Sequence, residues 1–297
     1  MSLKSVKNAP VAMHAHGKTL AMPMSHDLPL ILAQSPLYDS LLNRLAHYLR
    51  QRDGFVSIVD VGANIGDTVI ACRLESSDTA LCIEPNGEYW PYLQQNLRLS
   101  EGNCLSSQSL VGRTDGVLNV SAYTSGGTAR YITGTTGFPA AVRTIPSLMS
   151  TAGMEQCNLL KIDTDGHDFD CLRGAEKLLN HSTPAILFEA DLFGNTRYGE
   201  ELFDIVSMLV KMRYTLFIFY TNDGCFFNYY TNDTINQIYK AAFYQTIKNN
   251  TYFDVLALAD QAFLQNELDY FVDITKDAGR NKVAHSIAAS ISADPLR

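Results

Sequence analysis

The stretch FVSIVDVGANIGDTVIACRL, residues 55–74, joins two kinds of sequence pattern at a glycine loop. Its first seven residues are apolar and rich in β-branched side chains, which is typical of a buried strand. Residues 68–74 have the spacing of a helix. Between these segments, Gly62 permits a tight turn and Gly66 lets the helix approach the strand closely. We therefore predict a strand–loop–helix unit of the kind that begins a parallel sheet.

The same alternation of strand-like and helical segments continues along the chain. Further segments that read as strands are 79–83, 105–111, 158–162, 184–188, 213–220 and 251–258. Strands that alternate with helices are joined by right-handed crossovers and lie parallel in one sheet. We predict an α/β fold with a doubly wound, mostly parallel seven-stranded sheet and a late antiparallel strand. Ligands of such sheets bind at the carboxyl ends of the strands, where the strand order reverses.

We expect three parts along the chain. Residues 1–50 read as an irregular, proline-punctuated arm and a helix, and we expect the arm to fold over the ligand as a lid, with His26, Asp27 and Tyr38. Residues 51–262 form the main domain, with a small β-meander at 112–140 that is rich in Gly, Thr and Ser. Residues 263–297 read as a helical tail.

Composition limits the classes of partner. The chain has 297 residues, with 23 Lys and Arg against 31 Asp and Glu, so its net charge is −8. This balance argues against a nucleic-acid or membrane partner, which would need a basic face. The six cysteines are scattered and read as free thiols in a reducing compartment. Without an apolar leader or a membrane-length run, we expect a cytoplasmic protein, and a homo-oligomer stays open.

The glycine loop and the acid after the second strand point to a nucleotide-like ligand. The nicotinamide fingerprint needs a glycine where Asn64 stands, and no Gly-Lys-Ser/Thr follows as in a phosphate-binding P-loop. Glu84 closes the second predicted strand, 18 residues after Gly66. A carboxylate there can accept hydrogen bonds from both hydroxyls of a ribose. The loop therefore suits a nucleoside without a phosphate.

A second polar cluster, KIDTDGHD at residues 161–168, follows the fourth predicted strand. Its candidates for a general base are Asp163, Asp165 and His167, and a loop-positioning role for His167 stays open. We expect Asp168 to act as an N-cap or first-turn acid of the next helix. Glu189, at the end of the fifth strand, is a further candidate for the site.

We consider two metal ions for this cluster, calcium and magnesium. A calcium loop would need a glutamate at its twelfth position, and Gly174 stands there. A magnesium ion shared by Asp163, Asp165 or Glu189 stays an alternative that we do not favour. We assign no metal ligand.

The motifs together resemble a known family. DVGANIGD (60–67), followed by IEPN (83–86), resembles motif I and the second-strand acid of class I S-adenosylmethionine-dependent methyltransferases. LLKIDTDGHDFDCLRGAEKLL (159–179) is similar to the K-I-D-x-E/D-G segment of the FkbM methyltransferases, and PAILFEADL (184–192) fits their next strand. The chain departs at Pro146, where the family usually has a capping aspartate, and in carrying Asp165 and Asp168 where many members have glutamates.

The resemblance implies a Rossmann-like methyltransferase fold that uses S-adenosyl-L-methionine and releases S-adenosyl-L-homocysteine. It implies that Gly62, Asn64 and Gly66 cradle the methionine part and that Asp60 or Asp67 holds its ammonium group. Glu84 would bind the ribose. Leu110 and Val111, at the end of the third strand, would flank the adenine, and Glu189 would lie near the acceptor.

The implied activity is O-methylation of a hydroxyl on a saccharide or secondary metabolite, so the partner is a small-molecule hydroxyl acceptor. The alternative is a cofactor-binding protein of the same fold without catalysis, acting as a regulator or scaffold. The acids at 163–168 favour the enzyme, because a mere binder has no need of acids on the acceptor side. A nicotinamide dehydrogenase is weakened by Asn64.

Overall fold

A computed structural model describes residues 9–190, 197–247 and 252–292. The first eight residues of the arm, the last five of the tail and the final two of the segment 184–192 lie outside the described residues. The chain divides into two compact units, 1–259 and 260–297. The second unit holds α11 (Ala262–Ser292), in the segment that we expected to be a helical tail.

A main sheet of eight strands organises the first unit, in the order β13-β12-β14-β11-β10-β3-β4-β5. Five neighbouring strands run parallel: β11 (Ala185–Ala190), β10 (Leu159–Ile162), β3 (Ser57–Val61), β4 (Thr79–Ile83) and β5 (Asn103–Ser107). Between β10 and β3 the chain order reverses, which is the position where ligands bind in such sheets.

The far edge of the sheet is antiparallel. β14 (Phe253–Leu258) lies between β11 and β12 (Leu216–Thr221) and runs against both. β13 (Phe226–Thr231) forms a hairpin with β12. The predicted α/β fold with a mostly parallel sheet and a late antiparallel strand is confirmed, but the predicted number of seven strands was one too low. β13 escaped prediction because its sequence, FFNYYT, lacks the polar–apolar alternation of a half-buried strand.

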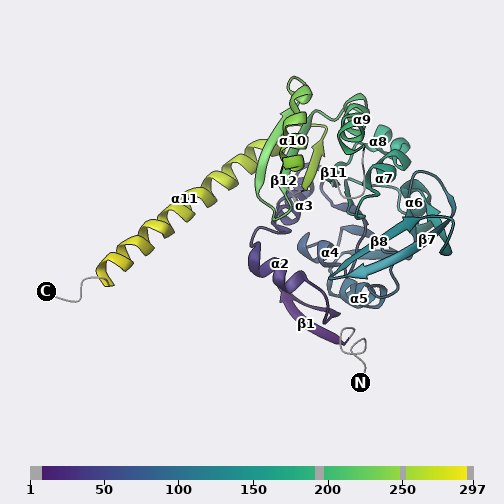
Figure 1. The fold of residues 1–297 in the computed structure, drawn as a ribbon, viewed down its shortest axis with the longest axis horizontal. Coiled ribbons are helices and arrows are strands. Elements are labelled where there is room, and N and C mark those ends of the chain that lie inside the picture. Colours follow the sequence, from purple (N-terminus) through teal and green to yellow (C-terminus); the bar gives the residue numbers. More distant parts are fainter. Residues whose placement is uncertain (1–8, 191–196, 248–251, 293–297) are drawn as a thin grey trace. The chain divides into compact units, whose positions relative to one another are not determined.

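Helices cover both faces of the parallel strands (Figure 1). On one face, alternate strand residues such as Val59 and Ile162 share a core with α6 (Ile145–Ala152), α7 (Asp168–Gly174), α8 (Glu176–Ser182) and α9 (Tyr198–Lys211). α7 contacts α6, α8 and α9. α3 (Ser40–Asp53), α4 (Asp67–Ala71) and α5 (Trp90–Asn96) belong to the segments before and after β3 and β4, and α10 (Tyr239–Ile247) precedes β14. The segment after the cluster 161–168 forms two helices, α7 and α8, divided at Ala175.

The N-terminal segment is more regular than predicted. β1 (Pro10–Ala15) and β2 (Lys18–Pro23) form an antiparallel hairpin that turns at His16 and Gly17, both with positive φ. α2 (Leu28–Gln34) follows. The prediction of an irregular arm was wrong because prolines at hairpin ends and in the first turn of a helix remove no needed hydrogen bond.

The segment predicted as a β-meander is a separate four-stranded sheet. Its strands are β6 (Leu110–Val111), β7 (Gly116–Ser125), β8 (Thr128–Thr133) and β9 (Phe138–Arg143), in the order β6-β9-β7-β8. Because β9 pairs with β7 and not with β8, the arrangement is not a meander. The strand predicted at 105–111 is likewise divided between the two sheets.

At the start of α6, Pro146 stands where the family that the chain resembles usually has a capping aspartate, and other residues cap this helix. Pro146 lies in the first turn, and the Thr144 side chain accepts the N–H of Ser147. Asp115, from the loop before β7, accepts the Thr144 N–H at 2.6 Å and the Ser147 hydroxyl at 2.8 Å. A carboxylate remote in sequence thus anchors this helix end.

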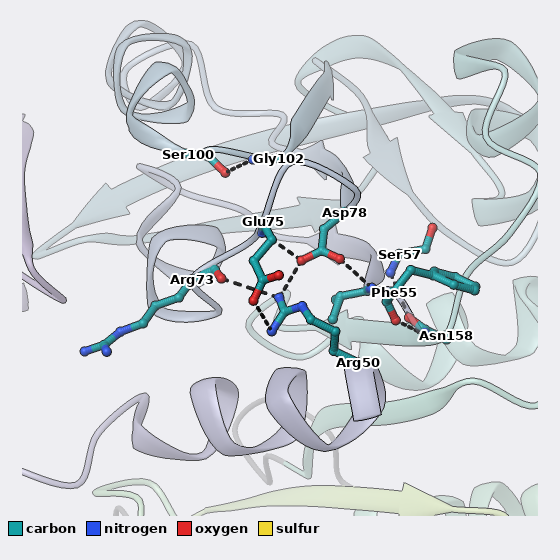
Figure 2. A network of polar contacts seen from close by, with 10 residues as sticks. Arg50, Phe55, Ser57, Arg73, Glu75, Asp78, Ser100, Gly102 and Asn158 are labelled. Carbon is teal, nitrogen blue, oxygen red and sulfur yellow. Dashed lines mark hydrogen bonds and ion pairs between the residues drawn. The ribbon is translucent and has the colours of Figure 1, made fainter. Parts of the chain in front are cut away.

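A polar network joins the amino ends of the parallel strands (Figure 2). Asp78 is fully buried, pairs with the guanidinium of Arg50 at the end of α3, and accepts the N–H groups of Val56 and Glu75 at 2.8 Å each. Although burial opposes it, these donors hold the pKa of Asp78 below its usual value. Asn158 similarly links the starts of β3 and β10.

Within the described ranges, no helix is long and apolar enough to cross a membrane.

Candidate active site

A cavity of about 670 Å³ opens at the carboxyl ends of the parallel strands. This volume lies in the usual range of small-molecule sites. Ten of the twelve residues predicted for the site line it: Gly62, Asn64, Asp67, Glu84, Leu110, Val111, Asp163, Asp165, His167 and Glu189. Asp60 and Gly66 do not. The fold therefore gathers most of the predicted residues around one space.

The glycine loop after β3 touches the loop after β10. Gly62 has φ +80°, and a Cβ there would lie 1.8 Å from the carbonyl oxygen of Asp163. The N–H of Asp163 donates to the carbonyl of Val61 at 3.0 Å. Gly66 has φ +87° and faces Leu93 of α5, so it serves helix packing and not the cavity wall. Only a glycine at 62 lets Asp163 stand beside the loop.

Asn64 connects three segments that are distant in sequence. Its Nδ2 donates to the carbonyl of Gly127 at 2.5 Å, and its Oδ1 lies 3.2 Å from Nε2 of His26. The N–H of Asp27 donates to the carbonyl of Gly126 at 3.0 Å. The turn between β7 and β8 and the segment before α2 therefore meet above the loop, and His26 lines the cavity.

Glu84, at the end of β4, is buried at the cavity wall. Its Oε2 accepts the N–H of Asn64 at 2.8 Å and its Oε1 accepts the N–H of Asn86 at 2.7 Å. Burial raises the pKa of Glu84 to about 7, against the effect of these two donors. A carboxylate has about four acceptor positions, so Glu84 can still accept two ribose hydroxyls.

Leu110 and Val111 reach the cavity from a different element than predicted. The third main-sheet strand ends at Ser107, and the pair forms β6 of the small sheet, beside β9. The small sheet also contributes Val120, Tyr131 and other residues of β7 and β8 to the lining. These residues make part of the cavity lining apolar.

The acidic wall is built around Lys161. Its ammonium lies 2.9 Å from Oδ2 of Asp163 and 3.8 Å from Oδ1 of Asp60. Asp60 is fully buried, and burial raises its pKa to about 6. Burial also raises the pKa of Asp67 to about 7. Of the two acids predicted for the ammonium of a cofactor, Asp67 faces the cavity and Asp60 stands behind the wall.

His167 is anchored to the small sheet. Its Nε2 lies 2.6 Å from the carbonyl oxygen of Tyr131, and because a carbonyl only accepts, Nε2 carries the proton. Asp165 lines the cavity from the same loop with φ +54°. The Nδ1 of His167 is left for another role.

Asp168 is an acid in the first turn of α7, as predicted, but it is not the N-cap, since His167 holds that position. Its carboxylate accepts the N–H and hydroxyl of Thr164, at 3.2 and 2.6 Å, and the N–H of Glu189 at 3.2 Å. Burial raises its pKa to about 7. The end of β11 lies next to the loop after β10, so these donors reach the carboxylate and it clamps the two strand ends.

Several lining residues escaped the sequence analysis. They are Asp39 before α3, Lys161 on β10, and Tyr252 and Asp254 at the start of β14. Asp254 lies opposite Glu189 in the β11–β14 pair, and both line a smaller adjoining cavity of about 60 Å³. Burial raises the pKa of Asp254 to about 8 and that of Glu189 well above its usual value. An aspartate inside the apolar run FDVLAL was the signal that could have revealed the pair.

The donor set fits an organic cation. Among the described residues, no group of three or more His, Cys, Asp and Glu side chains is arranged to hold a metal ion. The cavity is instead lined by the carboxylates of Glu84, Asp67, Asp163 and Glu189. Such a lining favours a ligand that combines hydroxyl donors with positive charge.

A family model described as "Methyltransferase FkbM domain" matches residues 60–216. The matched region contains the glycine loop, Glu84, the cluster 161–168 and Glu189. Among curated proteins, a sequence comparison finds no significant match.

Solved structures with similar chains are distant in sequence. Methyltransferase FkbM from Methylobacillus flagellatus KT is 16% identical with a TM-score of 0.38, over 64% of this chain and 54% of that one. The plantazolicin methyltransferase BpumL in complex with SAH is 12% identical with a TM-score of 0.41, over 78% and 88%. The precorrin-6y C5,15-methyltransferase from Geobacter metallireducens GS-15 is 11% identical with a TM-score of 0.37, over 78% and 87%. The chain spans about half of the first of these.

Proposed function

The chain belongs to the FkbM methyltransferase family, and on this premise we propose that it methylates a hydroxyl group of a saccharide or secondary metabolite. Members of the family depend on S-adenosylmethionine. The observation that carries the proposal is one cavity that joins the loop at Gly62, the acid Glu84 and the acid Asp163. In this proposal one cavity would hold the cofactor beside the base.

We assign the cofactor to the side of the cavity formed by β3, β4 and the small sheet. Glu84 would accept hydrogen bonds from the ribose hydroxyls, and Asp67 would face the ammonium group. Leu110 and Val111 would flank the adenine. The raised pKa of Asp67 and Glu84 supports this placement, because a bound cation stabilises carboxylates that burial disfavours.

We assign the chemistry to the acids around Asp163. When bound, S-adenosylmethionine supplies a methyl group on a positively charged sulfur. The task of the chain is then to hold the acceptor hydroxyl beside that carbon and to accept its proton as the oxygen–carbon bond forms. Asp163 is the preferred base, because its carboxylate lines the cavity and Lys161 fixes one of its oxygens.

Asp165, His167 and Glu189 are the other candidates. His167 already donates to Tyr131, which supports a positioning role. Glu189 lies between the two cavities, beside Asp254 and Tyr252, on the side that we assign to the acceptor.

The transfer is tested with radiolabelled S-adenosylmethionine and a panel of saccharide and polyketide-type alcohols. The proposal predicts a labelled product that survives mild base, as a methyl ether does and a methyl ester does not. Label on a carboxyl or an amine would contradict methylation of a hydroxyl group. Binding of S-adenosylhomocysteine without transfer to any alcohol of the panel would favour the regulatory alternative.

Two further assignments accompany this function. We propose that the segment 9–38 closes over the bound cofactor, because His26 contacts Asn64 and Asp27 contacts the β7–β8 turn. Protease protection of this segment on adding S-adenosylhomocysteine is expected, and unchanged cleavage would contradict it. We also propose a cytoplasmic protein, which the six free cysteines support.

A further inference from the structure

Lys161 occupies an unusual place for a lysine. It lies on the central strand β10, its side chain is 11% exposed, and it is the one lysine among the described residues that line the cavity. Burial of an ammonium is costly unless carboxylates surround it. Although burial works against the charge, the carboxylates of Asp163 and Asp60 raise the pKa of Lys161 well above its usual value.

The contacts of Lys161 join two strands. Lys161 and Asp60 are direct partners in the β3–β10 pair, with Nζ 3.8 Å from Oδ1 of Asp60. Neither oxygen of Asp60 has a hydrogen-bond partner among the described residues. On the other side, Nζ donates to Oδ2 of Asp163 at 2.9 Å. One ammonium therefore stands between a buried acid behind the wall and an acid that faces the cavity.

Further groups face this ammonium from the surrounding elements. The carboxylates are Asp39 from the turn before α3, Asp67 from α4 and Asp254 from β14, in addition to Asp60 and Asp163. The neighbouring thiols are Cys72 and Cys82, which burial keeps protonated by raising their pKa. Lys161 is thus the counter-ion of an otherwise acidic cluster.

We propose that Lys161 is a positioning residue for methyl transfer: its ammonium fixes the carboxylate of Asp163 in the cavity and balances the charge of Asp60 beneath the cofactor loop. The role of Asp163 in this inference rests on the proposed function. Without Lys161, Asp60 would be a buried carboxylate without a counter-ion, and the carboxylate of Asp163 would lose the hydrogen bond from Nζ that holds it.

The charge part of the proposal can be tested without cofactor or acceptor. Because Asp60 has a pKa of about 6 in the fold and about 4 in the unfolded chain, its stability contribution is present below pH 4 and lost as the pH rises through 6. In Lys161→Met the ammonium no longer stabilises the Asp60 carboxylate, so the pKa of Asp60 rises further. The loss of stability with rising pH then continues to higher pH than in the wild type. The melting temperature should therefore fall further at pH 8 than at pH 5.5, by about 5 °C.

Matched variants separate charge from packing. In Lys161→Arg the melting temperatures at pH 5.5 and pH 8 should differ as they do in the wild type. Lys177→Met, on the exposed side of α8, should leave both melting temperatures unchanged. Should Lys161→Met be too unstable to measure, Lys161→Met combined with Asp60→Asn should fold, because the buried acid is gone. An equal loss at both pH values, a failure of arginine to restore, or no rescue by Asp60→Asn would overturn the charge role.

The positioning part is tested by crystal structures of Lys161→Arg and of the double variant with S-adenosylhomocysteine. The proposal predicts that Asp163 keeps its place in the first and turns out of the cavity in the second. An unmoved Asp163 in the double variant would overturn this part. A structure without bound S-adenosylhomocysteine would contradict the proposed function, while the melting series would still decide the role of Lys161.

Discussion

The two ends of the parallel strands carry similar polar residues in opposite states. At the amino ends, Asp78 is buried with Arg50 and two backbone donors, and its pKa lies below the usual value (Figure 2). At the carboxyl ends, burial raises the pKa of Asp60, Glu84 and Asp254. One end satisfies its carboxylates within the protein, whereas the other leaves them short of positive charge.

This difference separates stability from function. A carboxylate with a lowered pKa stabilises the fold when ionised, and one with a raised pKa opposes it. We therefore interpret the acids at the carboxyl ends as groups that a bound cation would stabilise or a transferred proton would neutralise. Four variants test that contrast, in order of decreasing expected effect.

Asp163→Asn should give the largest effect, on activity alone. Removal of the proposed general base should lower the methyl-transfer rate by about 10²–10⁴-fold. Its stability should be near the wild-type value, because its side chain is 36% exposed. The rate is measured in single turnover with labelled cofactor, with Asp204→Asn on α9 as control. Equal methyl-transfer rates for the two variants would show that Asp163 is not the general base.

Asp78→Asn should give the largest loss of stability and leave cofactor binding unchanged. Breaking this buried ion pair removes the buried carboxylate that faces Arg50, at a cost of about 3–5 kcal/mol in the free energy of unfolding. Glu75→Gln removes a surface contact to the same guanidinium, 3.4 Å away, and should cost under about 1 kcal/mol. Urea denaturation measures both. Similar losses for the two variants would contradict the distinction.

Glu84→Gln should weaken S-adenosylhomocysteine binding by about 10–100-fold. The amide loses charge-assisted hydrogen bonds worth about 1.5–3 kcal/mol. The control is Glu88→Gln, an exposed glutamate two residues after Asn86. Isothermal titration gives both affinities. Retained affinity in Glu84→Gln would show that the ribose lies elsewhere.

Asp254→Asn should give the smallest effect, and only at high pH. The pKa of Asp254 is about 8 in the fold, so its contribution is present below pH 4 and lost as the pH rises through 8. An uncharged isostere avoids that loss and should therefore stabilise the protein more at pH 8.5 than at pH 5. Thermal unfolding at both pH values, beside Asp233→Asn, measures it. A destabilised variant at pH 8.5 would mean that Asp254 is paired within the protein.

The parts of the site that follow local motifs could be predicted from the sequence. β4 has the predicted bounds, 79–83, and Gly62, Glu84 and Asp163 line one cavity because each directly follows a parallel strand. Topology brings such positions to the same edge of a sheet whatever their separation along the chain.

The parts that depend on remote partners could not. Asp168 bonds Thr164 and the N–H of Glu189 instead of its own helix, and Asp115 anchors α6 from a different loop. Asp39 and Asp254 reach the acidic wall from the two ends of the first unit. No local pattern marks such contacts, since each depends on how distant segments pack.

The central claim is tested most directly by a crystal structure of the wild-type protein with S-adenosylhomocysteine. The account predicts the ribose hydroxyls within hydrogen-bond distance of Glu84 and the sulfur on the side of the cavity that faces Asp163. A ligand bound outside this cavity, or one whose sulfur points away from the acids after β10, would contradict it.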